Sequence, residues 1–154
     1  MSDLKDRLRT DLTASIKARD GLRSSTLRMV LSAVTNAEVA GKQARELSDE
    51  DLVGVLTSES KKRREAAEAF AGAGRTEQAA KERAEAEVIA GYLPEQLTED
   101  EITAMVSATI EELGVREDGI QALGRVMGAL QPKTRGRADG GLVAAAVRAQ
   151  LGGS

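Results

Sequence analysis

Apolar residues recur at helical spacing through the first part of the chain. The first stripe consists of Leu4, Leu8, Leu12 and Ile16. Residues four apart share one face of a helix, so this stripe predicts a buried helix face that ends before Gly21. Comparable patterns continue as far as Pro94. The four helices predicted in this part cover about residues 3–19, 22–39, 48–72 and 76–90.

A short linker and a new helix start divide the chain near its middle. Residues 94–97 are predicted to form the linker, because a proline disfavours helix in the residue before it. Thr98 and Glu101 then match a capping box, in which each side chain pairs with the other's backbone N–H. We therefore predict two domains, residues 1–94 and 95–154.

Two further helices are predicted after the one that begins at Thr98. Asp118 is the predicted cap of the first, Pro132 its predicted end, and Asp139 the predicted cap of the second. Alanine, the best helix former, is the commonest residue, and there is one Tyr, one Phe and no Trp. The chain is thus predicted to be all-α with seven helices. Predicted inward-facing residues of the last two are Ile120, Leu123, Val126, Met127, Leu130, Leu142, Val143, Ala146, Val147 and Leu151.

The residues that are missing exclude several kinds of site. The chain has no Cys and no His, so it cannot form a disulfide, a thiolate or imidazole metal site, or a Ser-His-Asp triad. We predict no catalytic residue, no metal and no cofactor. The start of the chain is charged and amphipathic, unlike a signal peptide, and the apolar runs are too short to span a bilayer. A cytoplasmic protein without membrane association is expected.

The net charge of −3 hides an uneven distribution. Residues 95–118 hold eight acidic side chains against Arg116 alone, whereas residues 125–148 hold five basic side chains against Asp139 alone. A local basic excess in an acidic protein points to a polyanionic partner.

A basic run lies within the third predicted helix, at residues 61–64. One interpretation is contact with RNA or phosphate. The other is a solvated face with ion pairs one turn apart, in which Arg63 leans inward toward Glu82 or Glu85 of the facing helix. The residues that the first interpretation assigns to RNA binding are Lys61, Lys62 and Arg64.

The most informative stretch is a glycine-flanked basic segment at residues 124–140. A loop over residues 133–141 would present backbone N–H groups and positive charge, and the start of the last helix would add its positive dipole end. The alternative is a helix connection that happens to be basic. No aromatic residues are interleaved, so base stacking is not indicated. The candidate RNA-binding residues here are Arg125, Lys133, Arg135 and Arg137.

Several long segments together resemble the YqeY family. They are LRMVLSAVTNAEV, LSDEDLVGVLTSESKKRREAAEAFAGAGR, KERAEAEVIAGYLPEQLTEDEI and GRVMGALQPKTRGRADGGLV. YLPEQL and the GRVMG…PK…GRADG block are the most specific parts, and the resemblance covers about residues 3–151. The family is similar to the C-terminal region of GatB, a subunit of the tRNA-dependent amidotransferase. The resemblance implies two helical bundles, one of four helices and one of three.

The resemblance also implies a role related to tRNA or to carbon–nitrogen ligase activity with glutamine as amido donor. This chain lacks the catalytic cradle of GatB and an amidase-type glutaminase nucleophile. We therefore expect a binding module that contacts tRNA or structured RNA and is not catalytic alone. The alternative is an adaptor that docks on an amidotransferase, an aminoacyl-tRNA synthetase or another protein.

Overall fold

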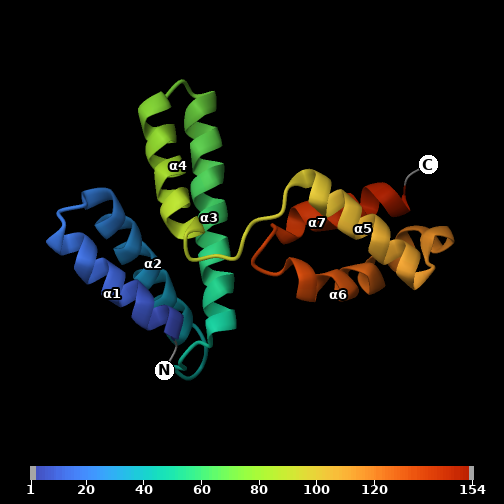
Figure 1. Cartoon of the computed structure of the whole chain (residues 1–154), viewed down its shortest axis with the longest axis horizontal. Helices are drawn as coiled ribbons and strands as arrows, with labels where there is room; N and C mark the ends of the chain where they lie inside the picture. The colour runs from blue at the N-terminus through green and yellow to red at the C-terminus, as the bar shows by residue number, and fades with distance from the viewer. Residues whose placement is uncertain (1–2, 153–154) are drawn as a thin grey trace. The chain divides into compact units, whose positions relative to one another are not determined.

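The computed structural model describes residues 3–152, and all regular structure within that range is helical, which confirms the all-α prediction (Figure 1). The chain divides between Leu93 and Pro94 into two compact units. The first unit contains α1 (Asp3–Lys17), α2 (Gly21–Val39), α3 (Asp49–Gly72) and α4 (Thr76–Ala90). The second contains α5 (Glu99–Leu113), the 3₁₀ segment η1 (Arg116–Ala122), α6 (Leu123–Thr134) and α7 (Gly140–Leu151). The division into two domains, residues 1–94 and 95–154, stays a prediction.

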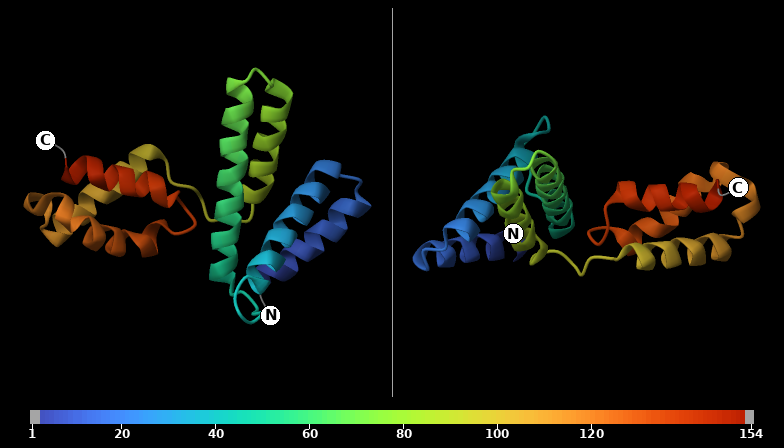
Figure 2. Two further views of the ribbon diagram at one scale, coloured as in Figure 1. Left: turned by 180° about the vertical axis from the view of Figure 1, so that it is seen from behind. Right: turned by 90° about the horizontal axis from the view of Figure 1, so that it is seen from above.

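The first unit is built from two antiparallel helix pairs. α1 packs along α2 and α3 along α4, and the two pairs diverge toward the turns that join their helices (Figures 1 and 2). Because the pairs meet only over part of their length, the buried apolar side chains gather where α2 crosses α3 and α4. The main cluster consists of Leu8, Leu27, Val30, Leu56, Ile89 and Tyr92. A smaller cluster consists of Val34, Leu47 and Leu52.

Local capping signals set most helix starts. Ser48 begins α3 with a capping box, in which its hydroxyl accepts from the Asp51 N–H. The break between α1 and α2 differs from the prediction. Arg19 adopts the left-handed conformation at φ 58°, Asp20 caps α2, and Gly21 is the first residue of α2 rather than the end of α1. The Asp20 cap bond to the Arg23 N–H stabilises the start of α2, which explains the shift.

The second unit packs α5, α6 and α7 around an aliphatic core. The predicted capping box is confirmed, because Thr98 accepts from the Glu101 N–H and Glu101 accepts from the Thr98 N–H. Gly114 ends α5 at φ 64°. The core consists of Ile102, Val106, Ile110, Val115, Ala122, Val126, Leu130, Val143, Val147 and Leu151.

Three predictions about α6 were wrong. Asp118 does not cap α6; it lies in η1, where Gly119 at φ 66° breaks the helix, and α6 begins only at Leu123. This break rotates Ile120 outward, so that 51 % of it is exposed. Pro132 does not end α6, which continues to Thr134. The proline costs the helix one backbone hydrogen bond, because it has no N–H to donate.

Two other predicted core positions are also exposed. Leu142 is 53 % exposed and Ile16 is 48 % exposed. Leu142 lies in the first turn of α7 and Ile16 in the last turn of α1, next to a connecting turn in each case. Near a helix end, a stripe position has fewer neighbouring side chains to cover it, so helical spacing alone overestimates its burial.

Candidate nucleic-acid interface

The basic segment of the second unit lies on α6 and on a short loop after it. α6 includes Lys133 and ends at Thr134, so the loop covers residues 135–139 rather than the predicted 133–141. Arg125, Lys133 and Arg135 are exposed, whereas Arg137 is half-buried. Eight residues separate Arg125 from Lys133 on α6, which places them about 12 Å apart along the helix axis.

The backbone of this loop is folded back on the end of α6. The N–H groups of Arg135, Arg137 and Ala138 donate to the carbonyls of Gln131 and Thr134. Gly136 is buried and adopts φ 76°, a conformation that a residue with a side chain rarely takes. The expectation that the loop offers its N–H groups to phosphate is therefore wrong at these three positions.

Three hydrogen bonds tie the loop to the segment that precedes α5. Gln96 Nε2 donates to the Gly136 carbonyl at 2.8 Å, and the Leu97 N–H donates to the Arg137 carbonyl at 2.8 Å. Arg137 Nε in turn donates to the Glu95 carbonyl at 3.1 Å. We call these three bonds the connector–loop lock. The lock joins the YLPEQL and GRADG segments, the two most specific parts of the family resemblance.

The lock separates the predicted basic residues into two groups. Arg137 already has a backbone partner, whereas Arg125 and Lys133 make no ion pair with any other residue of 3–152. The start of α7 is also occupied, because an Asp139 carboxylate oxygen accepts from the Gly141 N–H at 2.9 Å. The predicted Asp139 cap is thus confirmed. That carboxylate leaves the positive end of the helix less able to bind a phosphate.

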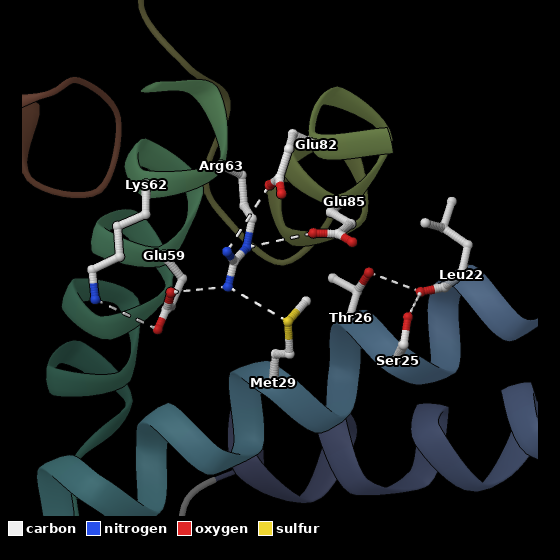
Figure 3. A network of polar contacts seen from close by, with 9 residues as sticks. All are labelled: Leu22, Ser25, Thr26, Met29, Glu59, Lys62, Arg63, Glu82 and Glu85. Carbon is white, nitrogen blue, oxygen red and sulfur yellow. Dashed lines mark hydrogen bonds and ion pairs between the residues drawn. The ribbon is translucent and has the colours of Figure 1, made fainter. Parts of the chain in front are cut away.

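The basic run of α3 is used differently. Arg63 points inward and lies within 4.0 Å of the carboxylates of Glu59, Glu82 and Glu85, with Met29 of α2 beside it (Figure 3). The interpretation in which Arg63 pairs with the facing helix is confirmed. Lys61 lies 3.9 Å from Glu65, and Lys62 lies 3.9 Å from Glu59.

The Arg63 cluster contains more acidic than basic side chains, because three glutamates surround one arginine. The side chain of Glu85 is only 5 % exposed. Burial and the neighbouring Glu82 raise the pKa of Glu85 above its usual value, although Arg63 and Lys81 oppose this. Arg63 Nε and Glu82 Oε2 are buried without a hydrogen bond to any described residue. The cluster therefore holds α3 against α4 through charge as well as packing.

A second polar cluster, around Tyr92, was not predicted. The phenol oxygen donates to Asp11 at 2.5 Å and accepts from Arg23 at 2.9 Å, and the Arg7 guanidinium lies 4.6 Å from the ring centroid. Burial and the hydrogen bond to Asp11 raise the pKa of Tyr92 to about 12. The sequence signal is a lone tyrosine at a helix end, but its hydrogen-bond partners lie 69 and 81 residues earlier.

No group of three or more His, Cys, Asp or Glu side chains among residues 3–152 is arranged to hold a metal ion. No helix described in the chain is long and apolar enough to cross a bilayer.

Comparison with known proteins gives consistent matches. The chain is 29 % identical over 134 residues to altered inheritance of mitochondria protein 41 of Pyrenophora tritici-repentis, covering 86 % of this chain and 71 % of that protein. It is 32 % identical over 118 residues to the protein of the same name from Lachancea thermotolerans, covering 74 % of this chain and 62 % of that protein. Both relatives are named as mitochondrial proteins, and a cytoplasmic location for this chain stays a prediction.

The model of the Yqey-like protein family matches residues 5–151, which include all seven α-helices except the first two residues of α1. The predicted family is confirmed by this match, and the chain belongs to the Yqey-like protein family.

Proposed function

We propose that this chain is an RNA-binding module whose second unit contacts the phosphates of tRNA or another structured RNA. The observation that carries the proposal is the connector–loop lock, which fixes the loop of residues 135–139 against the segment before α5. The fixed loop begins with the exposed Arg135, two residues after the exposed Lys133, and the exposed Arg125 lies further back on α6. Because the backbone of this surface is already ordered, binding phosphate there costs no entropy for ordering the loop.

The same surface favours contact with phosphates over reading of bases. The aromatic residues of the chain are Phe70 and Tyr92, both in the first unit, so the second unit has no ring on which a base could stack. Backbone recognition of this kind depends on the shape of the RNA and on its charge, and it is weakened by salt. Structured RNA with closely spaced phosphates is the ligand class that fits.

We propose that the chain resembles the tRNA-dependent amidotransferase in binding tRNA and not in catalysis. The chain has neither His nor Cys, and the candidate residues of the second unit are cations that contact phosphate rather than groups placed for proton transfer. We therefore expect the purified chain, mixed with Glu-tRNA, glutamine and ATP, to release no glutamate above background. Clear turnover by the isolated chain would contradict the role as a binding module.

The direct test uses the full chain and a series of salt concentrations. In the loop variant, Arg125, Lys133 and Arg135 are changed to Gln while Arg137 is kept, because Arg137 belongs to the lock. The slope of log K against log salt for tRNA should become shallower by roughly 2–3, at about 0.7–0.9 per phosphate contact. The affinity should fall to a similar degree for tRNAs of different sequence.

The matched control changes Lys61, Lys62 and Arg64 to Gln, which removes the same charge from α3. This control should bind tRNA nearly as the original chain does. An unchanged salt slope in the loop variant would overturn the proposed surface and favour a protein adaptor. A loss confined to the control would place the RNA surface on the first unit.

A further inference from the structure

The outer side of the α1–α2 pair carries positive charge that no acidic partner takes up. Arg9 and Lys17 of α1 and Arg28 of α2 are exposed, and none of them forms an ion pair with another residue of 3–152. Two acids of the pair are engaged elsewhere, and the exposed Asp6 is a third acid near Arg9. Asp11 accepts from Tyr92, and Asp20 caps α2.

These cations lie on the side of the pair that is turned away from α3 and α4. On α1, Arg7 and Asp11 face Tyr92, so Arg9, two residues from each, lies on the opposite flank. On α2, Met29 faces Arg63 of α3, and the adjacent Arg28 is rotated away by about 100°. Both flanks are solvent-exposed in the first unit.

Two cross-helix contacts bring the flanks together. Lys5 Nζ lies 2.8 Å from a Glu38 carboxylate oxygen, and the hydroxyl oxygens of Ser15 and Ser24 lie 2.8 Å apart. In this antiparallel register, the middle of α1 runs beside residues 27–33 of α2. Arg9 and Arg28 therefore belong to one continuous surface. We call this surface the outer α1–α2 face; its exposed members are Arg9, Thr13, Lys17, Ser25, Arg28, Ser32 and Thr35.

The hydroxyl groups of this face are arranged as hydrogen-bond acceptors. Thr13 donates to the Arg9 carbonyl at 3.2 Å, Ser25 to the Leu22 carbonyl at 3.1 Å, and Thr35 to the Leu31 carbonyl at 3.0 Å. The protons of these three hydroxyls are thus used within the helices, and each oxygen keeps acceptor capacity at an exposed residue. Cations with acceptor oxygens between them match a ligand that presents anions beside hydroxyl donors.

We propose that the outer α1–α2 face is a second RNA-contacting surface that recognises the ribose–phosphate edge of an RNA helix. Arg9, Lys17 and Arg28 contact phosphates, and the oxygens of Thr13, Ser25 and Thr35 accept hydrogen bonds from ribose 2′-hydroxyls. DNA lacks that hydroxyl, so this face favours RNA. The proposal rests on the RNA-binding function proposed above and adds the first unit to it. Asp6, one turn before Arg9, is the acid that opposes binding on this face.

The first test compares charge variants of the full chain binding tRNA. Arg9 and Arg28 changed to Gln should weaken binding about tenfold at moderate salt and flatten the salt slope by about 1.5–2. Arg75 and Arg83 changed to Gln remove the same charge from exposed positions on the α3–α4 pair, and this control should change binding little. Asp6→Asn should strengthen binding.

The second test probes the acceptor oxygens with an RNA hairpin, its 2′-O-methyl form and the DNA hairpin of the same sequence. The original chain should bind the RNA most tightly, because only this form carries hydroxyl donors. Thr13→Val combined with Thr35→Val keeps the side-chain shape and should reduce the preference for RNA over the 2′-O-methyl form severalfold. An unchanged preference in that variant would overturn the role of the hydroxyls.

The outcomes separate this inference from the proposed function. If the original chain fails to bind tRNA, the RNA-binding function falls and this face falls with it. If the loop variant of the second unit weakens binding but Arg9→Gln with Arg28→Gln matches its control, only the second surface is overturned. If Arg9→Gln with Arg28→Gln loses binding to vesicles of anionic lipid but keeps tRNA binding, the second RNA surface is also overturned, and the face is assigned to membrane surfaces.

Discussion

The two basic regions singled out by sequence, residues 61–64 and residues 125–137, have different uses in the fold. In α3, Arg63 is 21 % exposed and lies among three carboxylates, while Lys61 and Lys62 lie near acids of the same helix. On α6, Arg125 and Lys133 have no acidic partner within residues 3–152. Arg63 of the denser run is thus used within the fold, whereas Arg125 and Lys133 of the sparser one keep their charges exposed. Burial and partners, more than charge density, distinguish a binding surface from a structural one.

The largest expected effect comes from breaking the Arg63 cluster. Arg63→Met leaves Glu59, Glu82 and Glu85 without their shared cation in a poorly solvated site. The free energy of unfolding should fall by about 3 kcal/mol, as measured by urea denaturation. Arg64→Gln is the matched control on the exposed side of the same turn and should change stability by less than about 0.5 kcal/mol. Equal effects of the two substitutions would remove the contrast between the basic regions.

A smaller effect is expected from Asp139, the acid that follows the second basic region. Asp139→Ala removes the cap of α7 and should lower the free energy of unfolding by about 1 kcal/mol. The same change removes a negative charge beside the loop, so affinity for tRNA should stay the same or rise. Guanidinium denaturation and tRNA titration on one preparation measure both. Loss of tRNA binding without loss of stability would assign Asp139 to the ligand instead of to the cap.

Arg137→Lys sharpens the distinction between a positioning residue and a phosphate contact. Lysine keeps the positive charge but cannot reproduce the donor geometry of Arg137 Nε to the Glu95 carbonyl. The loop amides of residues 135–139 should exchange hydrogen faster, and tRNA affinity should drop modestly while the salt slope is unchanged. Gln96→Ala, which removes another bond of the lock, should behave in the same way. If Arg137→Lys leaves affinity and exchange unaltered, Arg137 acts as a plain charge.

The smallest effect concerns the acids around Arg63 and depends on pH. The pKa of Glu85 is raised in the folded chain above its usual 4.5, so the folded state binds this proton more readily than the unfolded state. The stabilisation is therefore fully present below about pH 4.5 and is lost as the pH rises through the folded-state pKa. Glu85→Gln should therefore gain stability relative to the original chain as the pH rises above about 4.5. Parallel urea curves of the two proteins that do not diverge with pH would contradict this.

Local signals in the sequence predicted much of the fold but little of how the candidate site is held. The Thr98–Glu101 box and the inward direction of Arg63 follow from neighbouring residues and helix geometry, and both were predicted correctly. Ile120 was misplaced, because η1 breaks the helical phase that the prediction assumed. The bond from Gln96 to Gly136 joins residues 40 positions apart. No periodicity or cap marks such a contact, so the connector–loop lock became visible only in three dimensions.

Hydrogen exchange of the full chain with and without tRNA tests the central claim most directly, because it reports both basic regions in one experiment. Binding through the second region predicts slower exchange at residues 123–139 when tRNA is present. Residues 57–65, which include the Arg63 cluster, should exchange at the same rate with and without tRNA. Protection confined to residues 57–65, or protection of neither region under conditions where tRNA is bound, would contradict the assignment of the RNA surface to α6 and its loop.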